Sequence, residues 1–134
     1  MLRATLIFLI PALLLTGCQQ YETPELERET AKMGATERAS YIAIARYLDC
    51  MAPLVRAAKK GPPLSDTQVE HLGKRCPAEL QDAVIKHDAW TLARPPRDSD
   101  DLETLKLPQA ERLRRQEEFL AGTFWCDFRK CWIA

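Results

Sequence analysis

The chain has 134 residues, with 19 basic and 19 acidic side chains and five cysteines. This length predicts a single domain with a modest hydrophobic core. A balanced charge excludes the basic excess that a nucleic-acid-binding surface needs, so we expect no nucleic-acid partner.

The first 17 residues are predicted to be a targeting segment. One positive charge, at Arg3, precedes an apolar run from Ala4 to Leu15. The run is long enough for the hydrophobic part of a signal peptide but shorter than the roughly 20 residues that span a bilayer. Pro11 interrupts it, which argues against an uncleaved anchor or a buried helix.

The sequence Leu15-Thr16-Gly17-Cys18 closes this segment and resembles the lipobox of bacterial lipoproteins. The resemblance implies that residues 1–17 are removed and that Cys18 becomes an N-terminus carrying acyl chains such as palmitate. Two or more such chains anchor a protein stably, so the membrane is the expected partner of Cys18. In Gram-negative members of this class, an aspartate directly after the cysteine holds the protein at the inner membrane. Gln19 stands there instead, which implies an outer-membrane anchor with the protein facing the periplasm.

Cleavage before Cys18 leaves a lipidated tether, residues 18–23, and a single periplasmic domain, residues 24–134. Four cysteines belong to that domain, and an even number in an oxidising compartment predicts disulfides. They are Cys50, Cys76, Cys126 and Cys131.

Two helices are predicted in the first part of the domain. Thr23 and Pro24 indicate the N-cap and first position of a helix that runs to Met33. After a break at Gly34 and Thr36, a long helix covers residues 37–60. Its polar residues form one narrow stripe, which includes Pro53 as well as Arg46, Asp49, Arg56 and Lys60. Because the rest of its surface is apolar, we expect this helix to be central and covered by helices on both flanks.

Gly61-Pro62-Pro63 ends the long helix, and Ser65 with Gln68 matches the capping box of the next one. Cys50 and Cys76 each lie 13 residues from Pro63. An antiparallel helical hairpin about this turn would bring the two cysteines level, as a disulfide requires. We therefore predict a Cys50–Cys76 bond, the alternative being two buried free thiols.

A further helical segment is predicted from Pro77 to Ala93, followed by a linker that contains three acids. These acids, Asp98, Asp100 and Asp101, precede a short helical turn. Their spacing lacks the glycine and the distal glutamate of a calcium-binding loop. We interpret them as a charged helix cap, and we expect neither a metal nor a cofactor.

Pro108 opens the last predicted helix, which carries the pairs Glu111 with Arg115 and Arg114 with Glu118. The densest basic patch, residues 112–115, is flanked by acids. We therefore expect a solvated face there, rather than a site for lipid headgroups or an acidic partner.

The C-terminus combines two cysteines with four aromatic residues, Phe124, Trp125, Phe128 and Trp132. We favour a helix end at Gly122, after which Cys126 and Cys131 can close a small loop. The alternative is a continuous helix, in which the aromatics form a stripe and each cysteine needs another partner. The aromatics either complete the core, which we favour, or form an exposed patch that binds a protein partner or the membrane interface.

Catalytic motifs are missing from the sequence. His71 has polar neighbours and is predicted at the surface, whereas His87 lies on an apolar face and is predicted to be a satisfied core histidine. No phosphate loop, nucleophile elbow or zinc-protease motif occurs. We therefore expect a non-catalytic protein, with a hydrolase using dispersed carboxylates as the remaining enzymatic alternative.

These observations predict an all-α fold, a small helical bundle with an antiparallel hairpin stapled by a disulfide and an aromatic C-terminal segment. Two binding functions suit a lipid-anchored domain of this kind. One is an adaptor or assembly factor for an envelope protein. The other is an inhibitor or immunity protein against a periplasmic toxin or wall enzyme. Both rest on architecture alone.

Overall fold

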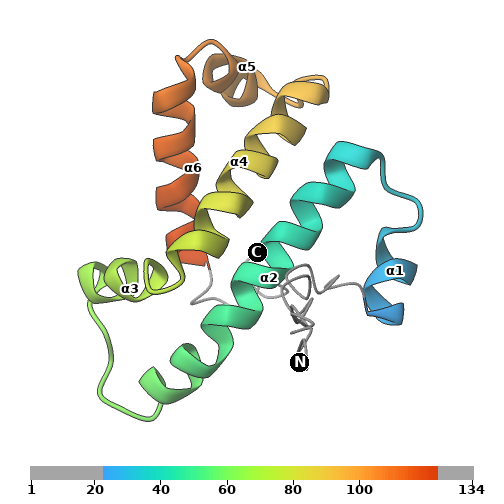
Figure 1. Cartoon of the computed structure of the whole chain (residues 1–134). Helices are drawn as coiled ribbons and strands as arrows, with labels where there is room; N and C mark the ends of the chain where they lie inside the picture. Colours follow the sequence, from blue (N-terminus) through green and yellow to red (C-terminus); the bar gives the residue numbers. More distant parts are fainter. Residues whose placement is uncertain (1–22, 124–134) are drawn as a thin grey trace, which may run out of the picture.

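The computed structural model describes residues 23–123, and these residues form helices and no strand (Figure 1). The predicted all-α fold is therefore confirmed. The helices in chain order are α1 (Pro24–Thr30), α2 (Ala35–Ala58), α3 (Asp66–Gly73), α4 (Pro77–Ala93), α5 (Ser99–Leu105) and α6 (Gln109–Thr123). Among these helices, none combines the length and the apolarity that crossing a membrane requires.

The predicted capping residues position two of these helices. Thr23 Oγ1 accepts a hydrogen bond from the backbone N–H of Leu26 at 3.2 Å. The capping box of α3 is complete, because Ser65 Oγ accepts from the N–H of Gln68 and Gln68 Oε1 accepts from the N–H of Ser65. Side-chain caps replace the hydrogen bonds that the first turn of a helix cannot make, so these short sequences determine where α1 and α3 begin.

The boundary between α1 and α2 differs slightly from the prediction. α1 ends at Thr30 rather than Met33, and the Thr30 hydroxyl donates to the carbonyl four residues earlier at 2.8 Å. α2 begins at Ala35 rather than at residue 37, because Gly34 takes the N-cap position without a side-chain cap. Both shifts are of the size expected at helix ends.

The core lies where α2, α4 and α6 meet. α2 packs mainly on α4, while α6 packs on α4 and α3. α2 and α4 lie side by side and run in opposite directions (Figure 1). The buried hydrophobic cluster consists of Ala43, Tyr47, Met51, Cys76, Leu80, Ala83, Val84, Leu120 and Ala121.

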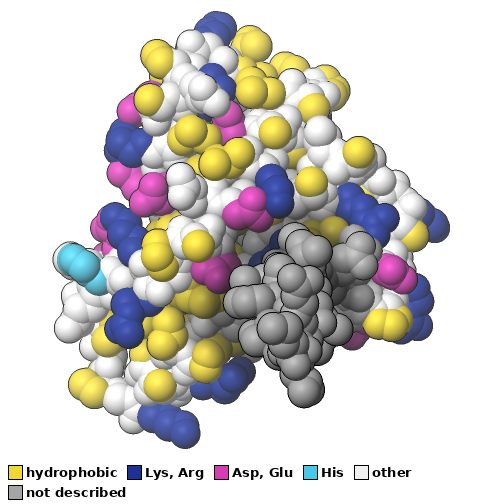
Figure 2. Space-filling view, in the orientation of Figure 1, with side chains coloured by type: hydrophobic (Ala, Val, Ile, Leu, Met, Phe, Trp, Pro, Cys, Tyr) yellow, Lys and Arg dark blue, Asp and Glu magenta, His cyan; other side chains and the backbone are white. Residues whose placement is uncertain are grey.

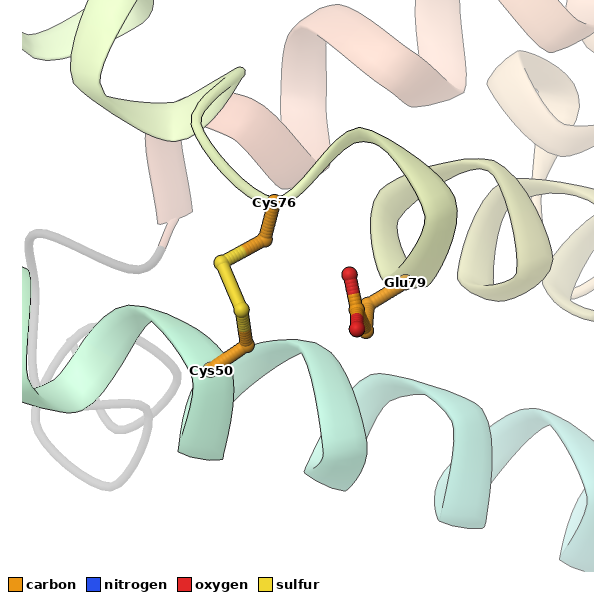
Figure 3. A group of neighbouring side chains, drawn as sticks. All are labelled: Cys50, Cys76 and Glu79. Atoms are coloured by element: carbon orange, nitrogen blue, oxygen red, sulfur yellow. A yellow bond between two sulfur atoms is a disulfide. The ribbon is translucent and has the colours of Figure 1, made fainter. Parts of the chain in front are cut away.

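The predicted Cys50–Cys76 disulfide is confirmed and joins the middle of α2 to the start of α4 (Figure 3). The two Cα atoms are 6.3 Å apart. The second arm of the stapled hairpin is α4 rather than α3, which packs on α6. The buried Tyr47 hydroxyl of α2 donates to the carbonyl of Gly73 at 2.7 Å and so ties α3 to the pair. Burial raises the pKa of Tyr47.

Within residues 23–123, α2 is not covered on both flanks as predicted. α4 packs along one flank, and α1 contacts α2 only to a small extent. There Tyr41 donates a hydrogen bond to Glu29 at 2.9 Å. Pro53 is exposed inside α2, in agreement with its place on the polar stripe. The prediction of two covering helices is therefore wrong for the described residues, because much of the second apolar flank lines a groove.

Candidate functional site

A groove of about 260 Å³ opens between α2, α4 and the C-terminal part of α6. Six of the eleven lining residues come from α2, and most of the lining is apolar. The lining residues are Met33, Glu37, Ser40, Tyr41, Ile44, Tyr47, Leu48, His87, Trp90, Phe119 and Leu120. Concave apolar surfaces with a few polar groups are the usual form of binding sites in proteins.

Two polar side chains in the groove satisfy each other. Ser40 Oγ and His87 Nδ1 are 3.2 Å apart, and Ser40 is buried. Burial is the main cause that lowers the pKa of His87, and the charge of Arg94 adds to it, so the ring is neutral at pH 7. The ring also packs against Trp90, with 5.3 Å between the ring centroids. His87 thus has a hydrogen-bond partner as predicted, but it is half-buried in the groove wall rather than in the core.

The Ser40–His87 contact does not have the form of an activated nucleophile. Ser40 lies inside α2, where the neighbouring backbone N–H groups are used in helical hydrogen bonds. Those groups cannot turn toward Ser40 Oγ to form an oxyanion hole, which acyl transfer requires. The groove is therefore better suited to holding an apolar group than to cleaving a bond.

A buried salt bridge connects α4 with α6. Arg112 Nε and Nη2 donate to the two carboxylate oxygens of Asp88 at 2.9 and 3.0 Å. Arg112 Nη1 donates to the carbonyl of Leu107 at 2.8 Å, and Gln116 Nε2 donates to Asp88 at 3.2 Å. Asp88 is 3% exposed and Arg112 is 8% exposed. The hydrogen bond to Asp88 raises the pKa of Arg112, and both carboxylate oxygens of Asp88 accept hydrogen bonds from α6.

The sequence-based interpretation of residues 112–115 is therefore wrong for Arg112. Arg114 and Arg115 face solvent as predicted, and the expected pairs are present, with Arg114–Glu118 at 2.6 Å and Arg115–Glu111 at 3.0 Å. These arginines hold the pKa of Glu111 at about 2. Arg112 differs because its side chain turns toward the core between the two helices.

One signal in the sequence could have indicated this pair. Asp88 stands among apolar residues of α4, and a charge on an apolar helix face requires an opposite charge. Arg112 lies four residues before Gln116 and eight before Leu120, which places all three on one face of α6. Which of three neighbouring arginines turns inward depends on the packing of α6 against α4, and the sequence does not contain that information.

The three acids cap a helix as predicted, but α5 begins at Ser99 rather than at residue 102, so Asp98 is the N-cap and Asp100 and Asp101 lie in the first turn. Asp98 accepts a hydrogen bond from the N–H of Asp101 at 2.8 Å. Asp101 in turn pairs with Arg94 at 2.6 Å and Arg97 at 3.1 Å. These hydrogen bonds hold the pKa of Asp101 well below its usual range. A carboxylate already neutralised by two guanidinium groups is a poor ligand for calcium.

Glu79 lies beside the disulfide in Figure 3. Its carboxylate and the sulfurs of Cys50 and Cys76 lie within 4.8 Å of one another, which is a spacing that a metal ion could use. The two sulfurs are bonded to each other, however, and a metal binds thiolates. In its oxidised state this cluster is a structural cross-link.

A row of apolar residues is exposed on the other side of α4. Ile85 and Leu92 are each 51% exposed, and Ala89 is exposed between them. Their spacing of four and seven residues places them on one stripe, about half a turn away from His87. Hydrophobic side chains gather over the upper part of the molecule in Figure 2, where α4 and α5 lie.

Several predicted site residues lie outside the described residues, as does the pairing of the last two cysteines. They are Cys18, Phe124, Trp125, Cys126, Phe128, Cys131 and Trp132. α6 includes Gly122 and extends to Thr123, so the prediction that Gly122 ends this helix is wrong. Gly122 does not adopt the positive φ of a glycine that terminates a helix.

The described residues thus combine a groove, an exposed row and a tightly linked core. Ser40, His87 and Asp88 each have a hydrogen-bond partner among the described residues. Comparisons with protein-family models, curated proteins and solved structures find no match to this chain.

Proposed function

We propose that this protein is a non-catalytic adaptor or assembly factor of the bacterial envelope, anchored in the outer membrane through Cys18 and facing the periplasm. The lipobox-like sequence supports the anchor. The observation that carries the binding role is the exposed row on α4, formed by Ile85, Ala89 and Leu92. Apolar side chains grouped on an exposed surface are typical of protein interaction sites.

The row lies on a helix that is held from two sides. The disulfide attaches the start of α4 to α2, and the Asp88–Arg112 pair attaches its middle to α6. A rigid helix binds at a lower entropic cost than a flexible loop. An apolar stripe on such a helix fits an amphipathic helix or an apolar segment of an envelope protein.

A pull-down with a charge-introducing variant tests this function. The tagged protein is cross-linked in intact cells and purified from detergent-solubilised envelopes. Ile85→Glu combined with Leu92→Glu should reduce recovery of its partner at least tenfold, because two charges would be desolvated in the interface. The matched control, Gln109→Glu with Ala110→Glu, introduces the same charges at exposed positions of α6 and should retain the partner.

Two results would change the conclusion. Equal recovery of every captured protein with both variants would contradict a binding role for the row on α4. A captured wall enzyme or toxin whose activity falls when the protein is bound would favour the inhibitor over the adaptor.

A further inference from the structure

We propose that the C-terminal segment, residues 124–134, docks in the groove between α2, α4 and α6. This inference goes beyond the proposed binding role, which rests on the opposite side of α4. It assigns an occupant to the groove from three independent features: the apolar surface of α2, the place where α6 ends, and the composition of the segment.

The first feature is an apolar stripe on α2 that no helix within residues 23–123 covers fully. Tyr41, Ile44 and Leu48 lie at spacings of three and four residues, so they form one stripe along α2. All three line the groove, and none is fully buried by the described residues. α2 has the narrow polar stripe of a helix covered from two sides, yet α4 is the helix that packs extensively on it. Burying the second stripe would therefore add hydrophobic stabilisation.

The second feature is the position of the segment relative to the groove. Phe119 and Leu120 line the groove, and α6 is described to Thr123, less than one turn beyond Leu120. Along α2 the lining runs from Glu37 to Leu48, which is about 17 Å of helix. Eleven residues can extend about 36 Å. The segment thus begins beside the groove and is long enough to follow its whole length.

The third feature is the match in chemistry. Four of the eleven residues after Thr123 are aromatic, and Trp90 and Phe119 stand in the groove wall. Phe119 is 48% exposed, a high value for a large apolar side chain next to a buried Leu120. Contacts between aromatic rings contribute more binding free energy than their buried area alone provides. Since Ser40 and His87 bond to each other, the groove requires no polar group from its occupant.

Photo-cross-linking in the full-length, lipidated protein tests this assignment. Benzoylphenylalanine replaces Phe128, the protein is irradiated in outer-membrane vesicles, and the cross-links are mapped by mass spectrometry. We expect intrachain cross-links to residues 33–48 or 87–90. The control places the same probe at Ile85, on the other side of α4. The yield of groove cross-links from the probe at Phe128 should be more than tenfold higher than the yield of cross-links to the C-terminal segment from the probe at Ile85.

A groove variant completes the test. Met33→Glu places a charge at the edge of the groove in the turn between α1 and α2, and it should lower the cross-link yield at least fivefold. Unchanged circular dichroism and an intact Cys50–Cys76 bond would show that the fold is retained; if it is not, Phe119→Glu replaces this variant. Cross-links to a second copy, to acyl chains or to sites outside the groove, or no cross-link from the probe at Phe128, would overturn the proposal.

Discussion

At the scale of single residues, the Asp88–Arg112 pair is a buried interaction that joins α6 to α4. Both side chains are buried, and the carboxylate receives a bidentate bond from Arg112 and a third bond from Gln116. Such a pair need not stabilise a fold compared with apolar residues of the same size. Breaking it is costly, because one charge then remains buried without its partner.

We therefore predict that Asp88→Ala lowers the free energy of unfolding by about 3–5 kcal/mol. Urea denaturation followed by circular dichroism measures this change. The double variant Asp88→Leu with Arg112→Met should recover most of the loss, since it removes both charges. The matched control Glu111→Gln breaks exposed pairs and should leave the transition midpoint almost unchanged. A loss as large in the double variant as in Asp88→Ala would contradict this explanation.

His87 makes stability dependent on pH in a defined direction. Burial lowers its pKa in the folded protein below the ordinary value of 6.5. The unfolded chain therefore binds a proton at a higher pH than the folded one, and stability decreases as pH falls from about 6.5 through the folded pKa. Above about pH 6.5, the contribution of neutral His87 to the stability of the fold is fully retained.

His87→Gln should accordingly flatten the dependence of unfolding free energy on pH between pH 5 and 7. The measurement is a series of urea titrations in buffers of equal ionic strength. The control His71→Gln changes an exposed histidine and should keep the slope of the original protein. An unchanged slope in His87→Gln would show that another group titrates in this range.

At the scale of helices, the disulfide determines how α2 and α4 are paired. It connects positions 26 residues apart, so it restricts the unfolded chain more than it restricts the folded one. Cys76 itself belongs to the core cluster that includes Met51 and Leu80, and Cys50 packs against this cluster. The disulfide and the buried core side chains therefore hold α2 and α4 together at the same place.

Replacing both cysteines, as Cys50→Ala with Cys76→Ala, should lower the free energy of unfolding by roughly 3.5 kcal/mol in the chain-entropy model. Urea denaturation under non-reducing conditions gives the value. The original protein treated with a reductant serves as the comparison and should show a similar loss. A loss below 1 kcal/mol would mean that the unfolded chain already keeps α2 and α4 close together.

At the scale of the whole molecule, the domain is predicted to work at the end of a short lipidated tether. Cys18→Ser removes the thiol that would be acylated, while the fold of residues 23–123 should be retained. We expect the variant in the soluble periplasmic fraction, with unfolding behaviour like that of the original domain. Fractionation of cells and mass measurement of the N-terminus test this, and acylated Cys18→Ser protein in the outer membrane would contradict the lipobox assignment.

The sequence by itself was sufficient for the features that depend on neighbouring residues. Thr23 and Ser65 cap helices because their hydroxyls reach N–H groups only three residues away. The Cys50–Cys76 bond was predicted from a proline-rich turn midway between the two cysteines, and the bond is present, although the helix antiparallel to α2 is α4 rather than α3, which follows the turn. His87 was predicted to be satisfied because its neighbours at helical spacing are apolar, and it has a hydrogen-bond partner, although it lies in the groove wall rather than in the core. The lipidated tether at Cys18 also depends on a local motif, and it stays a prediction.

Only the tertiary structure decided the features that depend on how distant helices pack. Arg112 has two arginine neighbours, and only the contact of α6 with α4 selects it to meet Asp88. Both flanks of α2 are apolar in the sequence, yet α4 covers one and leaves Ile44 and Leu48 in the wall of a groove. Hydrophobic periodicity shows which faces avoid water, but it does not show what covers them, because that depends on contacts between residues far apart in the chain.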